Sequence, residues 1–367
     1  MPLPLIIGAA ALAAGAFGAK KGYDGYQKHS EADDIVKSAK KRYDSNKTVF
    51  DKQEQDTQSE LSRLGSLELE IGKSFGEFKT LADELLKKLN ERRADKLEIH
   101  IPKHKLQKVE NYSYSAIGVL GSAVGAGAAG AAAGFAVYGG VMALGAASTG
   151  TAISSLAGAA ATKATLAAIG GGSLATGGLG IAGGTAVLGA AVAAPVLAIA
   201  GWAYNSHGEE ALKNAHKADR EVDNAVQKLT KASKQLAKVQ QYASNIRNTL
   251  LSIHSEFKKY FENLKKVNAV VENSKALNID HTALLNNLSN DIIQTINNGY
   301  VLASILTDLI STPIFKVKEV NGRVVKDKNG TPEMDKDIDG SMILNEVALN
   351  SAINDAKNSV SSHPGTA

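Results

Sequence analysis

Cysteine is absent from this 367-residue chain, and proline and aromatic residues are scarce. Without a thiol there is no disulfide framework, no cysteine nucleophile and no cysteine-ligated zinc site. The 7 prolines and the aromatic content of 5% suit long helices better than a compact α/β core. The net charge is only +4, a mild excess that is compatible with an anionic lipid surface but does not indicate nucleic acid.

Charge is also nearly absent from a long central stretch. Among the 98 residues between Glu110 and Glu209, Lys163 is the only charged one. A bilayer requires such a composition, whereas a water-soluble domain does not. Residues 112–207 are therefore predicted to be a Gly/Ala-rich membrane-insertion region, in which Ser115 to Ala147 is long enough to span. Four aromatic residues bracket this region, where an interfacial belt would lie: Tyr112, Tyr114, Trp202 and Tyr204.

Small residues recur at every fourth position within this block. One stripe holds Gly121, Gly125, Ala129 and Ala133, and the adjacent one holds Ser122, Ala126, Gly130 and Gly134. Gly180 and Gly184 form a further pair. Such stripes let helix backbones approach closely in lipid, so they predict helix packing and a homo-oligomer. The alternative is a low-complexity sequence with accidental periodicity.

Lys163 admits two interpretations. An ionisable residue inside a membrane is a candidate functional residue. Its side chain could equally reach the interface near the tip of the block, which we favour.

The N-terminal segment, residues 1–29, holds a second apolar block over residues 3–19, followed by Lys20 and Lys21. A signal peptide would carry its positive charges before the apolar run, not after it. A spanning helix here would leave the bulk of the protein in the cytoplasm. A buried or monotopic helix is the alternative.

Long charged helices with apolar heptads flank the central block, which predicts an all-α fold. The first, over about 30–95, has regular core positions that Glu68 interrupts and belongs to a coiled-coil region, residues 30–111. The second covers about 209–275, and an apolar helix over 281–311 should cover it, giving a region 208–312. Apolar residues occupy every core position of the second coil: Val222, Leu229, Leu236, Ala243, Leu250, Phe257, Leu264 and Val271 in one seam, and Ala218, Ala225, Ala232, Val239, Ile246, Ile253, Tyr260 and Val267 in the other. The pattern leaves open whether the two coils pair within one chain or between chains.

The C-terminal region, residues 313–367, predicts a small β-hairpin turning at Asn321-Gly322 and a short helix near 342–358. An acidic loop between them fits the calcium pattern D-x-[DN]-x-[DN]-G-x₅-E, with candidate ligands Asp335, Asp337, Asp339 and Glu346. The loop resembles that of the EF-hand family, except that the entering segment is not helical. A solvated acidic loop without calcium is the alternative that we favour.

No pattern in the chain indicates an enzyme. Residues 178–183 fit the dinucleotide motif G-x-G-x-x-G, but no acidic residue follows until Glu209 and glycine saturates the surroundings. We therefore expect no catalytic residues, no small-molecule substrate and no cofactor, and calcium at the acidic loop is the less favoured alternative.

Two parts of the sequence carry a resemblance. MPLPLIIGAAALAAGAFGAKKGYDGY, followed by a coil and then STGTAISSLAGAAATKATLAAIGGGSLATGGLGIAGGTAVLG, resembles a family of uncharacterised bacterial glycine-zipper proteins. The central stretch is faintly similar to small apolar membrane proteins induced by interferon in animals. In architecture, a coil–insert–coil chain is similar to helical pore-forming toxins of the cytolysin A type and to the apolar hairpin of channel-forming colicins.

These observations predict a membrane-inserting protein whose partner is a lipid bilayer. A pore-forming or permeabilising effector is expected, because Ala and Gly prevail over stronger apolar residues and insertion should be marginal and switchable. The alternative is a coiled-coil scaffold that is anchored in the bacterial cytoplasmic membrane and recruits partner proteins. The coils are expected in the cytoplasm, or in a soluble form that precedes insertion.

Overall fold

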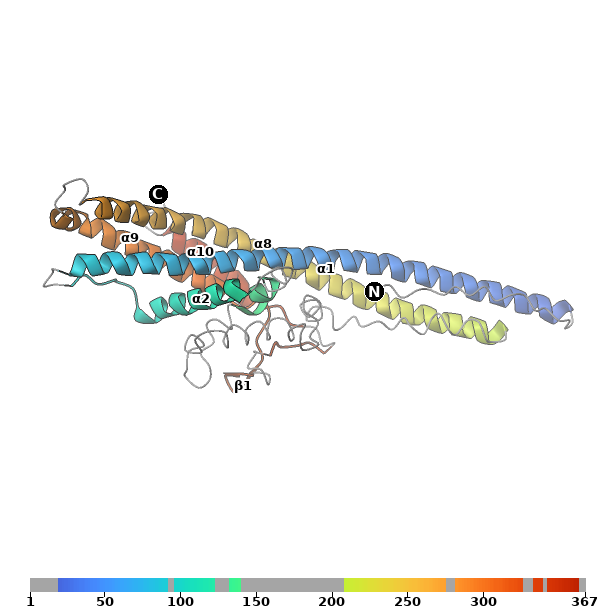
Figure 1. Ribbon diagram of the computed structural model, residues 1–367. Helices are drawn as coiled ribbons and strands as arrows, with labels where there is room; N and C mark the ends of the chain where they lie inside the picture. The colour runs from blue at the N-terminus through green and yellow to red at the C-terminus, as the bar shows by residue number, and fades with distance from the viewer. Residues whose placement is uncertain are drawn as a thin grey trace. The chain divides into compact units, whose positions relative to one another are not determined.

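The computed structural model of the protein describes residues 19–91, 96–122, 132–139, 208–274, 281–325, 333–338 and 342–362. Its elements, in chain order, are α1 (Ala19–Asn90), α2 (Lys103–Ser122), the π-helix η1 (Phe135–Gly139), α8 (Gly208–Asn273), α9 (His281–Ile310), β1 (Glu319–Val320), β2 (Arg323–Val324) and α10 (Glu346–Ser361) (Figure 1). The predicted all-α class is confirmed, because the strands of the described part are two residues long and every other element is helical.

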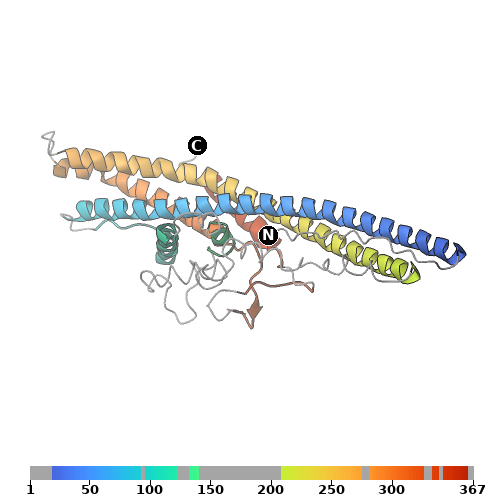
Figure 2. The same ribbon diagram turned by 45° about the vertical axis from the view of Figure 1, so that its right-hand side comes forward.

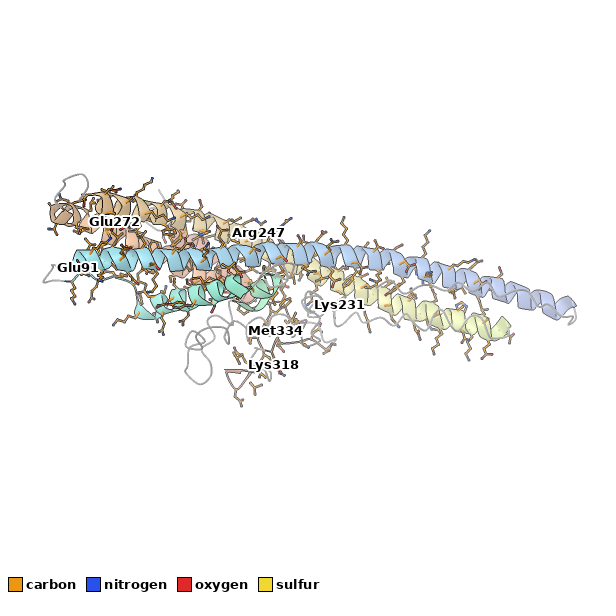
Figure 3. All side chains as sticks on the ribbon, viewed as in Figure 1. Glu91, Lys231, Arg247, Glu272, Lys318 and Met334 are labelled. Carbon is orange, nitrogen blue, oxygen red and sulfur yellow. The ribbon has the colours of Figure 1, made fainter. Side chains whose placement is uncertain are left out.

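Both long helices lie where the heptads predict them. α1 has 72 residues and begins earlier than the predicted start at Ser30, whereas α8 has 66 residues and nearly the predicted bounds. The predicted core of α1 is buried throughout at Leu61, Leu64, Ile71, Phe75, Phe78, Ala82, Leu85 and Leu89. The first seam of α8 is likewise buried from Val222 to Val271, and the second is buried or half-buried. Charged side chains cover the outside of both helices (Figure 3).

The chain divides into two compact units that cut across both long helices. Of the described residues, the first unit holds 19–54 and 208–236, and the second holds 55–139 and 237–362. The five consecutive segments expected from composition follow the chain instead. The difference arises because helices that lie side by side share a core, whatever their separation in sequence.

In the first unit, α1 and α8 pair through small side chains near their starts, and larger side chains such as Phe50 and Leu229 are also buried in this unit. Ala32 packs with Ala211 and Ala215 in a cluster of their own. Further along both helices, the Arg42 guanidinium binds Asp219 and, at 3.1 Å, Asp223. Residues further along α1 contact residues further along α8, so the two helices run in the same direction.

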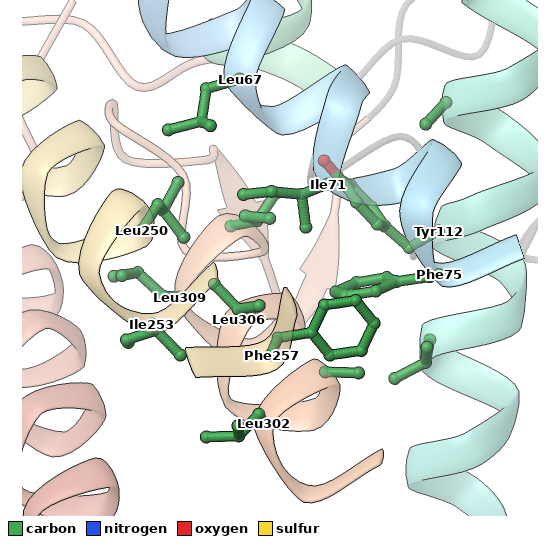
Figure 4. Packing of buried hydrophobic residues seen from close by; sticks show 14 of the residues in the cluster. Leu67, Ile71, Phe75, Tyr112, Leu250, Ile253, Phe257, Leu302, Leu306 and Leu309 are labelled. Carbon is green, nitrogen blue, oxygen red and sulfur yellow. The ribbon is translucent and has the colours of Figure 1, made fainter. Parts of the chain in front are cut away.

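In the second unit, α1 and α8 also pair within the chain and in parallel. Arg247 Nε lies 2.6 Å from Glu60 Oε1, and at the far end Lys88 binds Glu272. Figure 3 labels Arg247 and Glu272, the two partners on α8. The structure thus decides the question that the heptads left open. The core between them is aromatic: the Phe257 ring lies 5.3 Å from Phe75 and 5.2 Å from Phe78. Figure 4 shows Phe75 and Phe257 near Leu302, Leu306 and Leu309 of α9.

α9 covers this core as expected, with Ile292, Ile296, Leu302 and Leu306 fully buried. The predicted C-terminal helix is α10, which packs on α9. The hairpin is confirmed with its predicted turn: Glu319 pairs with Val324 and Val320 with Arg323. Asn321 and Gly322 have φ of 53° and 70°, as a type I′ turn requires.

Within the residues described above, no helix is both long enough and apolar enough to cross a membrane.

Candidate functional site: the root of the apolar insert

The apolar insert leaves the coiled coil through a segment that is packed against α1. We call α2 together with residues 132–139 the insert root. α2 begins directly after Pro102. The Pro102 carbonyl accepts hydrogen bonds from the amides of Lys105 and Leu106 in the first turn of this helix. Asn90, at the end of α1, holds the connection that leads to α2 by hydrogen bonds of 2.8 and 3.0 Å with the Leu97 backbone. Figure 1 and Figure 2 show α2 beside the later part of α1.

The expected boundary between residues 111 and 112 lies inside α2. Charges stop after Glu110, but the helix continues to Ser122. Composition changes at residue 112 while backbone hydrogen bonding does not, so the start of the predicted insertion region belongs to the same rigid helix as the charged residues before it.

Three glycines of α1 make room for the insert root. A Cβ at Gly65 would lie 1.8 Å from the Ala132 carbonyl oxygen, and one at Gly72 would lie 2.3 Å from the Ala116 Cβ. A Cβ at Gly76 would lie 2.8 Å from the Ser113 Oγ. None of these spaces admits a side chain without movement, so the glycines set how closely the root approaches. We call Gly65, Gly72 and Gly76 the glycine face of α1.

Tyr112 fastens α2 to this face. Its side chain is fully buried, and its hydroxyl donates a 2.7 Å hydrogen bond to the Glu68 carbonyl oxygen (Figure 4). Its ring lies 6.2 Å from Phe75 and 6.0 Å from Phe135, which belongs to the second piece of the root. Phe135 is also fully buried, so one tyrosine links both pieces of the root to the core.

The carboxyl group of Glu68 is buried beneath the root. Glu68 is 3% exposed, and within the described residues its carboxyl oxygens have no hydrogen-bond partner. Burial raises the pKa of the Glu68 carboxyl well above its usual range and, together with the Glu68 charge, raises that of the Tyr112 hydroxyl. The packed root therefore favours a protonated Glu68, and deprotonation as pH rises should weaken it.

Ser74 and His254 approach each other between α1 and α8 but are not arranged as a nucleophile and its base. The Ser74 Oγ lies 3.1 Å from the His254 Nε2, yet it already donates its proton to the Ile71 carbonyl oxygen at 2.7 Å. Burial, then the charge of Lys258, lowers the pKa of His254 to about 4. A neutral histidine that donates to a serine oxygen joins two helices and does not activate the hydroxyl.

The predicted packing and interface residues fall in different environments. Gly134 is buried in the root, whereas Gly121 is exposed and a Cβ there would meet nothing within 4 Å. Tyr112 is core, unlike an interfacial residue, and Tyr114 is 57% exposed. The side chains of Lys20 and Lys21 are not among those described. The apolar block before residue 19 and the remaining predicted residues lie outside the described residues: Gly125, Gly130, Lys163, Gly180, Gly184, Trp202 and Tyr204.

The candidate calcium loop is an extended segment where the structure describes it. The Asp335 amide donates to the Lys316 carbonyl oxygen at 2.8 Å, and the Asp335 carbonyl accepts from Ile343 at 3.0 Å. Glu346 begins α10 and lies 2.8 Å from the Lys238 Nζ. Asp339 lies outside the described residues. Among the residues that are described, which include Asp337, no three His, Asp or Glu side chains are close enough together to hold a metal ion. Calcium binding stays a prediction.

Comparison of the chain with family models, curated proteins and solved structures finds no match. The resemblances to glycine-zipper and toxin families therefore stay predictions that rest on the residues alone.

Sequence reasoning missed the glycine face. Heptad analysis follows apolar residues, and Gly65, Gly72 and Gly76 lie between them. A signal was present, since glycine inside a helix costs about 1 kcal/mol relative to alanine and its recurrence in a charged coil indicates close packing. Glu68 was noticed as an interruption of the heptads, but its place beneath Tyr112 depends on a contact between residues 44 positions apart.

Proposed function

We propose that the protein inserts its Gly/Ala-rich central block into a lipid bilayer and permeabilises it through oligomerised small-residue helices. The observation that carries the proposal is the stretch of 98 residues with Lys163 as its one charge. The structure described above would be the form that precedes insertion, with the insert root held on the coiled coil. The membrane is expected to be the bacterial cytoplasmic membrane.

The insert root supports a switchable form of this function. The glycine face meets small residues of the root, Ala116, Ser113 and Ala132, besides the larger Tyr112 and Ile117. Where small side chains meet, little apolar area is buried, at about 25 cal/mol per Å², so this part of the interface can separate at modest cost. The rings of Tyr112 and Phe135 are the main apolar groups that release would expose to water.

Dye release from anionic liposomes, measured together with flotation of the same sample, tests the proposal. We expect flotation with leakage for the native chain, and loss of leakage when Gly125→Leu and Gly130→Leu block helix packing. Ala128→Leu is the matched control, because position 128 lies outside both stripes. Leakage that persists in the double variant would contradict the packing argument.

A reversible lock tests whether the insert root must leave the coil. The Ser113 Oγ lies 2.8 Å from a Cβ at Gly76, close to the distance of about 3 Å that a disulfide places between one Cβ and the far sulfur. Gly76→Cys with Ser113→Cys adds the first two cysteines to the chain, so no other bridge can form within one chain. We expect no leakage when this variant is oxidised and full leakage after reduction. Equal leakage in both states would show that the root need not move.

The second candidate function is a membrane-anchored coiled-coil scaffold. The apolar N-terminal block followed by Lys20 and Lys21 favours it, because a released effector has no need of an anchor. Flotation without leakage, lost on removal of residues 1–18, would support this function over permeabilisation.

A further inference from the structure

We propose that a pocket between α1, α2 and α9 binds a small apolar molecule that carries one positive charge, such as an alkylammonium ion. The pocket has a volume of about 450 Å³, within the range of small-molecule sites. It lies in the second unit and its lining comes from all three helices. Neither the membrane-insertion function nor the calcium loop accounts for it.

The wall of the pocket is largely apolar. Apolar side chains from α1, from the segment before α2 and from α2 itself line it: Phe75, Ile99, Leu106, Val109 and Ile117. Ile117 is 44% exposed and so remains open to solvent, whereas Phe75 and Val109 are buried. This arrangement suits the hydrocarbon part of a ligand, which would enter beside Ile117 and leave the surrounding water.

An unsatisfied hydroxyl group lines the same pocket. Tyr300 of α9 is 5% exposed, and among the described residues its hydroxyl makes no hydrogen bond, although its ring lies 5.2 Å from Phe78. A buried hydroxyl without a partner costs about 1–3 kcal/mol. Burial first, then the charges of Asp83 and Glu110, raises the pKa of the Tyr300 hydroxyl, which stays protonated. A polar ligand group would satisfy this hydroxyl.

The charges around the pocket select a cation. Among the described residues, its lining includes three carboxylates and one cation, Lys79. Lys79 is shared, since its Nζ lies 2.7 Å from Asp83 and 3.6 Å from Glu110. Glu77, the third carboxylate, lies 3.8 Å from Lys73 outside the pocket. One carboxylate charge is therefore left uncompensated next to aromatic rings, whose faces also attract cations. An anion of the same size would meet net repulsion.

Binding in this pocket is coupled to the position of the insert root. α1, α2 and α9 must all be in place to form the lining, so a ligand binds only the packed form. At a concentration of 100 times its Kd, such a ligand favours the packed form about 100-fold. A small cationic amphiphile would thus hold the root on the coil.

Calorimetric titration of the full chain without lipid tests this proposal separately from membrane insertion. The probes are hexylammonium, hexanol and hexanoate, which share a chain and differ in charge. We expect hexylammonium to bind at least 10-fold more tightly than the other two and to raise the melting temperature. Asp83→Asn with Glu110→Gln should weaken its binding at least 10-fold.

Glu84→Gln is the matched control, because Glu84 neighbours Asp83 and pairs with Lys88 but does not line the pocket. It should leave binding unchanged. Ile117→Trp, which fills the mouth, should abolish binding while the far-ultraviolet dichroism stays native. Equal binding of hexylammonium and hexanoate, or unchanged binding in the double variant, would overturn the proposal. Neither result would bear on liposome leakage.

Discussion

The same two helices, α1 and α8, build two different cores in the two units. In the first unit one cluster joins three alanines with half-buried Ile35, Val36 and Leu212, and the larger buried side chains there include Phe50, Val222 and Leu229. In the second unit, aromatic rings fill the space between them, and α2, α9 and α10 add their own apolar faces. The heptad pattern continues through both units, so it predicts that α1 and α8 pair but not how stable their contact is. The apolar area that the contact buries sets its stability, and alanine buries little.

Removing one central ring should produce the largest effect. Phe257→Ala should destabilise the second unit by about 3–5 kcal/mol, because Phe257 is fully buried among three other phenylalanine rings and the ring of His254. Phe50→Ala makes the same substitution in the first unit, where 6% of Phe50 is exposed, and should cost about 3 kcal/mol, the low end of the same range. Urea unfolding combined with hydrogen exchange measures both losses of stability. Equal losses would mean that the two cores are equally strong.

The pH dependence of the second unit should follow His254. Its pKa is lowered from 6.5 to about 4 in the fold, so the unfolded state binds the proton more readily. The His254 contribution to stability should be complete above pH 6.5 and fall by up to about 3 kcal/mol as pH drops towards 4. His254→Gln should flatten this loss in urea titrations between pH 4 and 7, and an unchanged slope would contradict it. Glu68→Gln should have an effect at higher pH instead. It should stabilise the packed root at neutral pH, because glutamine cannot lose a proton there.

Adding a side chain to the glycine face should loosen the insert root and leave the coil paired. Gly72→Val would place a methyl group in the space held by Ala116 and should cost about 1–3 kcal/mol. Hydrogen exchange of α2 should rise, while that of α8 stays native. Gly121→Ala is the control, because the space around Gly121 is open, and it should stabilise α2 by up to about 1 kcal/mol. Faster exchange throughout the second unit would show that root and coil unfold together.

The smallest effect is expected in the first unit. Arg42 binds Asp219 and Asp223, but its side chain is 40% exposed, and solvent screens such pairs. Arg42→Gln should change the free energy of unfolding by less than about 1 kcal/mol, with a difference that vanishes at high salt. A larger loss would mean that this charge cluster, rather than the alanine contacts, holds the first unit together.

The sequence predicted much of the fold because the evidence for it is local. Heptads from Val222 to Val271 reveal a helix whatever its partner is, and Asn321-Gly322 marks a hairpin turn from two residues. The candidate site was less predictable. Tyr112 lies at the edge of an apolar block, as an interfacial residue would, but its hydroxyl donates a hydrogen bond to the Glu68 backbone on another helix. No spacing of residues along the chain predicts that contact.

The sequence by itself determined the helices, their apolar seams, the hairpin and the long uncharged block, because each depends on neighbours a few residues apart. Only the tertiary structure decided that α1 and α8 pair in parallel within one chain, that the glycine face receives the insert root, and that Glu68 and Tyr300 are buried without partners among the described residues. The physical reason is that burial and close approach are properties of surfaces. Such a surface forms only where two helices pack together, so the sequence of either helix by itself does not predict it.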